Sequence, residues 1–188
     1  MSQKRHFELL LGGLFLALAI GLPPAFHLVG LSSTFLPMFY PVLLAGFLLH
    51  YRISVPVALM APLVSAALTG MPPFYPPIAF IMMAEGLAMT LLPFLLFQRW
   101  RLNIYLSLAV TMLAERLILL LSTWVMADWL KLPGVVLGPM SLLKGLPGLV
   151  IIFLIIPPLV VGLKKKIKQM PFLPEESLDE AKSEELAK

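Results

Sequence analysis

A succession of long apolar stretches fills the chain from Phe7 to Leu163, and this feature limits the folds open to it. Of the 188 residues, 60% are hydrophobic and 13% are charged, whereas a typical soluble domain is about 45–50% apolar and about 25% charged. An apolar stretch of ~20 residues forms a helix long enough to cross a bilayer. We therefore expect an all-α integral membrane bundle, with room for five or six such helices and for no soluble domain with its own core.

Proline, glycine and charged residues divide this region into six predicted spans. The spans cover Phe7–Leu22, Phe35–Leu49, Ile53–Gly70, Ile78–Phe97, Asn103–Ala127 and Leu142–Leu163. The second, third and sixth contain prolines, which bent helices around a cavity would accommodate. Proline is also commoner in membrane helices generally, so bending is one of two interpretations.

Lysine and arginine are distributed unequally over the loops between these spans. With the N-terminus inside, the inner loops and the tail residues next to the spans hold nine of them, and the outer side holds only Lys131 and Lys144. The inner set comprises Lys4, Arg5, Arg52, Arg99, Arg101, Lys164, Lys165, Lys166 and Lys168. Because cytoplasmic loops are enriched in basic residues, both termini are predicted to face the cytoplasm. Residues 1–163 then form the membrane domain, and residues 164–188 form a cytoplasmic tail, basic and then acidic, that we expect to be flexible.

Three charged residues, Glu85, Glu115 and Arg116, fall inside predicted spans. A charge at mid-bilayer costs ~2.5–3.5 kcal/mol on insertion scales, so it usually faces a bundle interior, an opposite charge or a polar ligand. Glu85 and Arg116 are expected ~10 Å and ~16 Å below the outer surface, where they could form an ion pair or two walls of one pocket. Adjacent helix positions point about 100° apart, so Glu115 and Arg116 are each expected to need a partner of their own.

Small residues recur every fourth position on the first span, at Gly13, Ala17 and Gly21. This spacing places them on one helix face and lets another helix approach closely. They indicate either a docking stripe for a partner membrane subunit or tight packing inside this bundle.

Polar residues recur at the same spacing on the fifth span, at Asn103, Ser107, Thr111 and Glu115. Because lipid penalises polar groups, this face is predicted to point inward. For Asn103, Ser107 and Thr111, ordinary hydrogen bonds between helices are a sufficient reason.

Aromatic residues are frequent in the predicted outer loops and include Phe26 and Tyr75. The imidazole ring of His27 follows Phe26 in the sequence. They are typical of the aromatic belt at a membrane interface, and they could equally form the rim of a ligand pocket. Lys144, at the outer end of the sixth span, could extend to the interface or hold an acidic ligand group.

Motifs for catalysis or cofactor binding are missing from the sequence. There is no cysteine, no H-E-x-x-H, no G-x-S-x-G elbow and no P-loop pattern. We therefore expect no metal site, no cofactor and no enzyme activity in this chain, and ATP-driven work would need another subunit. The Lys164–Lys168 cluster is interpreted as a topology signal rather than a nucleic-acid-binding patch.

Several segments follow one another in a familiar order. Residues 35–46 read FLPMFYPVLLAG and residues 70–76 read GMPPFYP; Glu85, Ala114-Glu115-Arg116 and Gly145-Leu-Pro-Gly148 follow. Across the membrane part, this series resembles the substrate-binding S components of energy-coupling factor (ECF) vitamin transporters. The chain departs from that family at Met38-Phe39-Tyr40-Pro41, where relatives often have Met-His-Ile-Pro, and at Glu115, where they often have glycine.

The resemblance implies a six-helix subunit with an outward-facing pocket, in a bacterial or archaeal cytoplasmic membrane, that captures a small water-soluble vitamin or precursor. It implies as partners a transmembrane coupling subunit, which would dock on Gly13, Ala17 and Gly21, and two cytoplasmic ATPases. By position, it implicates six ligand-contacting residues: Phe26, His27, Tyr75, Glu85, Arg116 and Lys144. Arg116 and Lys144 would suit a carboxylate or phosphate group of the ligand, and Glu85 an amine or hydroxyl.

Two other functions stay open on the sequence. One is a self-sufficient secondary transporter or channel, although the span pattern shows no inverted repeat. The other is a structural membrane protein in which Glu85 and Arg116 form only a packing pair.

Overall fold

Helices make up all the regular structure in the part of the chain that the computed structural model describes, residues 2–28, 30, 32–75, 77–130 and 145–169. They are α1 (Ser2–Leu28), α2 (Ser32–Phe35), α3 (Phe39–Leu48), α4 (Tyr51–Thr69), α5 (Ile78–Pro93), the π-helix η1 (Phe94–Arg99), α6 (Ile104–Leu130) and α8 (Leu146–Lys168). The all-α prediction is confirmed for these residues.

Five helical segments are long and apolar enough to cross a membrane, with η1 extending α5 into one of them. They lie in α1, α4, α5–η1, α6 and α8. This supports the predicted multi-pass membrane protein. The prolines predicted to end the first span lie inside α1, which continues to Leu28. Proline fixes φ near −65°, a helical value, so a helix can continue through it although the ring removes a donor and crowds the carbonyl four residues earlier.

The predicted second span differs from the other five. It contains the end of α2 and then α3, a helix of ten residues that is only ~15 Å long at 1.5 Å per residue. Leu36 has φ 52° and Pro37 follows it, and this left-handed turn separates α2 from α3. The count of six membrane crossings therefore stays a prediction.

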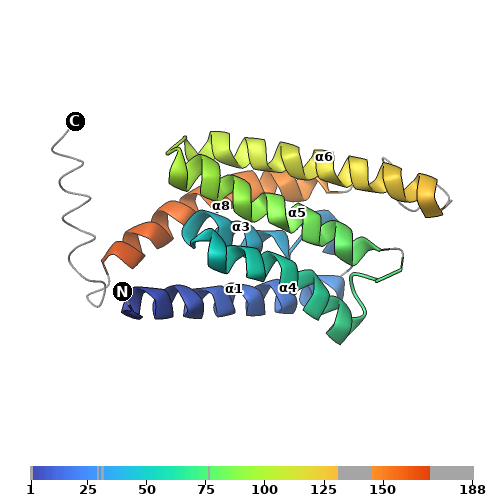
Figure 1. Ribbon diagram of the computed structural model, residues 1–188, viewed down its shortest axis with the longest axis horizontal. Helices are drawn as coiled ribbons and strands as arrows, with labels where there is room; N and C mark the ends of the chain where they lie inside the picture. Colours follow the sequence, from blue (N-terminus) through green and yellow to red (C-terminus); the bar gives the residue numbers. More distant parts are fainter. Residues whose placement is uncertain (1, 29, 31, 76, 131–144, 170–188) are drawn as a thin grey trace.

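The short helix α3 lies in the centre of the bundle, with α1, α4, α5 and α8 packed around it (Figure 1). All its residues except Tyr40 and Leu48 are buried. Irregular backbone is tolerated at membrane depth where protein covers it, which explains why a helix too short to span can occupy this position. Gly46 allows the close approach of α5, because a Cβ there would lie 2.5 Å from the Met89 carbonyl oxygen.

The π-helix η1 supports the end of α3. The Gln98 side-chain amide Nε2 donates hydrogen bonds to the carbonyl oxygens of Gly46 (2.8 Å) and Leu49 (3.0 Å). These are among the carbonyls that lack a partner at a helix C-terminus. Gln98 therefore caps α3 from a neighbouring element.

Among the long helices, α1, α4 and α6 run in one direction and α5 and α8 run in the opposite direction (Figure 1). The N-terminus of α1 and the C-terminal end of α8 lie at one end of the bundle, which we call the basic end because Arg5, Arg99 and Lys164–Lys166 belong to it. At the opposite end, which we call the far end, α1 and α4 finish and α5 begins.

Candidate ligand-binding site

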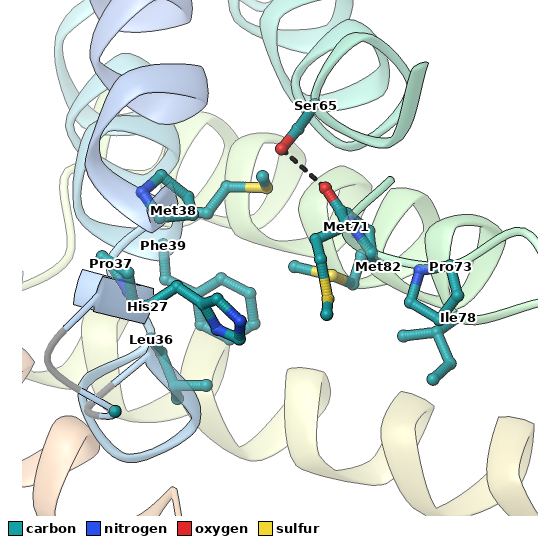
Figure 2. Close-up of a pocket in the computed structure, with 13 residues that line it drawn as sticks. His27, Leu36, Pro37, Met38, Phe39, Ser65, Met71, Pro73, Ile78 and Met82 are labelled. Atoms are coloured by element: carbon teal, nitrogen blue, oxygen red, sulfur yellow. Dashed lines mark hydrogen bonds between the residues drawn. The ribbon is translucent and has the colours of Figure 1, made fainter. Parts of the chain in front are cut away.

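A cavity of about 440 Å³ opens at the far end of the bundle. Its walls come from the last turns of α1, residues 36–39, the end of α4, the loop after α4 and the first turns of α5 (Figure 2). Ligand pockets in proteins usually measure ≈ 300–1,000 Å³. The cavity is therefore large enough for a small organic molecule.

The cavity walls are mainly apolar. Three methionines, Met38, Met71 and Met82, line it together with Phe39 and several prolines (Figure 2). His27 is its one ionisable side chain among the described residues, and no described lysine or arginine reaches it. Flexible methionines and an aromatic ring suit an apolar or aromatic ligand body.

The loop that closes one side of the cavity is held in place by hydrogen bonds. Ser65 Oγ donates to the Met71 carbonyl oxygen at 2.8 Å (Figure 2), and Thr69 Oγ1 donates to the same oxygen at 3.1 Å. The Met71 N–H donates to Thr69 Oγ1 at 3.2 Å. This wall of the cavity is therefore formed without any ligand.

The structure brings only one of the six predicted ligand residues to the cavity wall, His27. Phe26, its neighbour, packs instead beside Phe35, with ring centroids 6.1 Å apart. Tyr75 is 71% exposed and does not line the cavity. Lys144 lies outside the described residues.

Glu85 and Arg116 do not line the cavity either; they belong to a buried ionic cluster with Glu115. Glu85 is 3% exposed and Glu115 is 1% exposed, and α5 packs against α6. Arg116 Nε lies 3.0 Å from Glu115 Oε2. The expectation that these neighbours each need a partner elsewhere is wrong, because the long arginine side chain turns back across the 100° between adjacent positions.

Several polar atoms of this ionic cluster are buried without a hydrogen bond. They include Glu85 Oε1, both carboxylate oxygens of Glu115, and Arg116 Nε and Nη2. Arg116 and Glu115 are thus close enough to attract each other, while their N–H and oxygen groups are not aligned. Unsatisfied buried polar groups are uncommon and call for an explanation such as a bound group.

Arg116 extends from α6 to the first residue before α8. A Cβ at Gly145 would lie 3.0 Å from Arg116 Nη2 and 3.4 Å from Leu36 Cδ1. Leu36 also lines the cavity, so the ionic cluster and the cavity are neighbours near Leu36. This contact gives the Gly145-Leu-Pro-Gly148 segment a physical role, since glycine leaves space for the guanidinium.

The small residues Gly13, Ala17 and Gly21 are exposed on the outward side of α1. Nothing lies within 4 Å of a Cβ built at Gly13 or Gly21. Phe15 and Ala19 form the packed face of α1 instead. The stripe therefore does not pack inside this bundle, and partner docking stays a prediction.

Most residues that line the cavity were not among the predicted ligand residues, although many of them lie in two segments that carry the family resemblance. Residues 36–39 belong to the FLPMFYP segment, and Met71, Pro72 and Pro73 belong to GMPPFYP. The runs of proline and methionine were the available signal. Among the described residues, no group of three or more His, Asp and Glu side chains could hold a metal ion.

Comparison with known proteins identifies no relative: no protein-family model, no curated protein and no solved structure matches this chain.

Proposed function

We propose that this chain is the substrate-capturing membrane subunit of an ATP-driven importer, of the ECF S component type, for a small vitamin-like molecule. The observation that carries the proposal is the cavity of about 440 Å³ at the far end. Its walls include residues 36–39 and 71–73, from two of the segments that resemble S components. A preformed cavity at one end of a helical bundle suits capture of a ligand from that side.

The distribution of basic residues supports an outward-facing cavity. Arg5, Arg99 and Lys164–Lys166 lie at the basic end, opposite the cavity. Basic residues favour the cytoplasmic side of a membrane. With the basic end inside a bacterial or archaeal cytoplasmic membrane, the cavity faces the external medium.

The exposed stripe on α1 supports a partner in the membrane. Gly13, Ala17 and Gly21 leave a shallow face that no part of the described bundle covers. Small residues at this spacing let two membrane helices approach closely. A transmembrane coupling subunit would bind there, and two cytoplasmic ATPases would supply the energy.

The ionic cluster bears on the alternative of a purely structural protein. That alternative depends on a Glu85–Arg116 pair that ties α5 to α6. Among the described residues, Arg116 instead forms its ion pair with Glu115 of its own helix. The observed pair does not connect two helices, which weakens the structural reading.

The proposal is tested by purifying the tagged protein gently from its own host. We expect native mass spectrometry to detect a bound small molecule, and proteomics to detect a membrane subunit and two ATPases. An Ala17→Trp substitution would reduce recovery of the ATPases at least tenfold by blocking the stripe, whereas Ala67→Trp, at an exposed position on α4, would not. ATP-independent uptake by vesicles containing this chain alone would contradict the proposal and favour a secondary transporter.

A further inference from the structure

Among the described residues, the ionic cluster beside the cavity has one more carboxylate than it has cations. Glu85 and Glu115 are two acids, and Arg116 is the one described cation near them. Arg116 lies 3.0 Å from Glu115, so its charge is already committed. Glu85 is left with a buried Oε1 that has no hydrogen-bond partner.

An uncompensated carboxylate at this depth is costly, because a buried charge needs a partner of opposite sign. Such residues inside membrane bundles usually mark a binding site or an ion pathway. The missing charge can come from a proton or from a cationic group that enters the bundle. The position of Glu85 decides between these two sources.

Glu85 lies on the face of α5 that borders the cavity. Ile78 and Met82 line the cavity, and Glu85 follows Ile78 by seven positions and Met82 by three, a spacing that keeps all three on one helix face. At 1.5 Å per residue, Glu85 is ~4.5 Å beyond Met82 along the helix axis. Helical side chains lean toward the N-terminus of their helix, which for α5 is the cavity end.

Met82 lines the cavity one helical turn before Glu85 on the same face of α5, and Leu36 lines it near Arg116 on the other wall. Methionine is unbranched and adapts its shape readily. A change of the Met82 side-chain conformation would give a ligand group access to Glu85 without movement of the backbone. The Arg116 guanidinium lies beside Gly145.

We infer that the ligand of this cavity is an organic cation, with an apolar or aromatic body held among the methionines and Phe39 and a positively charged nitrogen group paired with Glu85. The inference rests on the proposed capture function and narrows its ligand class. It disfavours an anionic ligand, because no described lysine or arginine lines the cavity. It also assigns Arg116 to holding Glu115 rather than to ligand binding.

The test compares three probes of equal shape with the purified full-length chain in lipid nanodiscs: 4-phenylbutylammonium, 4-phenylbutanol and 4-phenylbutyrate. Binding is measured by calorimetric titration near neutral pH. We expect the ammonium probe to bind at least tenfold more tightly than the alcohol, and the carboxylate probe to bind weakest. Equal affinities of the ammonium and the alcohol, which a protonated Glu85 would produce, would overturn the inference. Tighter binding of the carboxylate probe, or no saturable binding of any probe, would also overturn it.

Two substitutions locate the preference. Glu85→Gln removes the carboxylate with little change of shape and should abolish the preference for ammonium over alcohol. Glu115→Gln leaves Glu85 in place but should reduce the preference for ammonium over alcohol severalfold, because Arg116 is then released to pair with Glu85. Glu8→Gln on α1, at the basic end, is the matched control and should leave the preference unchanged. An unchanged preference in Glu85→Gln would overturn the inference.

Lys144 provides a rival source of positive charge. If it neutralises Glu85, the wild type will show no ammonium preference and Lys144→Gln will acquire one, which would overturn the inference. Failure of this inference is distinguishable from failure of the proposed function. A chain without the ammonium preference that still recovers the ATPases would contradict only the inference. A chain that binds cations but recovers no ATPases would contradict only the importer role.

Discussion

At Gly148 a single hydrogen in place of a side chain lets α8 lie directly against the backbone of α2. A Cβ there would be 2.5 Å from the Thr34 carbonyl oxygen and 3.1 Å from the Phe35 carbonyl carbon. Both neighbours are backbone atoms, which cannot rotate away as a side chain can. The residues that follow, 36–39, line the cavity, so this contact supports the cavity wall from behind.

A Gly148→Ala substitution is expected to destabilise the protein by ~1–3 kcal/mol, the usual cost of overpacking. Thermal unfolding in detergent, followed by the fluorescence of the three tryptophans, Trp100, Trp124 and Trp129, measures the change. The control is Gly162→Ala on the same helix, where nothing lies within 4 Å of the added Cβ. That control is expected to be neutral or stabilising by up to ~1 kcal/mol, since alanine is the better helix former; equal shifts in the two variants would contradict the prediction.

For the buried charged residues, the sequence predicts burial but not the pairing of side chains. The positions of Glu85, Glu115 and Arg116 inside apolar spans were evident from the sequence, and two of them are nearly fully buried. Their pairing was not evident, because it depends on how the arginine side chain turns. Burial follows from hydropathy, whereas the Arg116–Glu115 contact follows from side-chain conformation and from the space left by Gly145.

Among the elements, α3 and η1 depend on each other. The helix α3 is short and buried on almost all sides, and the last carbonyls of a helix have no partner within it. Gln98 of η1 donates to two carbonyl oxygens at this end, those of Gly46 and Leu49. The π-helix turns this side chain toward α3, an arrangement consistent with the frequent occurrence of π-helical turns at positions with a specific role.

A Gln98→Met substitution keeps the length of the side chain but removes its amide donor. The carbonyl oxygens of Gly46 and Leu49 then lose this hydrogen-bond partner. The expected loss of stability is ~1–3 kcal/mol, the cost of unsatisfied buried polar groups. Thermal unfolding together with amide hydrogen exchange across residues 43–50 measures it, and exchange there should accelerate. Leu95→Met, at an exposed position in the same π-helix, is the control; similar behaviour of the two variants would show that Gln98 does not support α3.

For the whole molecule, the two ends of the bundle differ in charge and in shape. The basic end holds both the N-terminus and the end of α8, and the far end holds the cavity (Figure 1). This arrangement matches the single orientation that the lysine and arginine distribution favours. The proposed capture from outside requires the far end to face the medium.

The orientation of this chain can be measured with single introduced cysteines, because there is no native cysteine to remove first. Tyr75→Cys at the far end should react with a membrane-impermeant maleimide in intact cells. Arg5→Cys and Lys165→Cys, both exposed at the basic end, should react only after the membrane is opened. Labelling of Arg5→Cys in intact cells, or opposite results for Arg5→Cys and Lys165→Cys, would contradict the predicted topology.

The sequence by itself determined that this protein is helical and apolar enough for a membrane, because hydropathy and helix length are local properties of the chain. It also located the buried charges, and of the six predicted ligand residues it placed one, His27, at the cavity. Only the tertiary structure decided that α3 is a short central helix, that Arg116 lies beside Glu115, that the stripe on α1 faces outward, and that the cavity and the ionic cluster are neighbours. The Arg116–Glu115 contact depends on side-chain conformation, and the other features arise from contacts between residues far apart in the chain. Periodicity along a single helix carries no information about either.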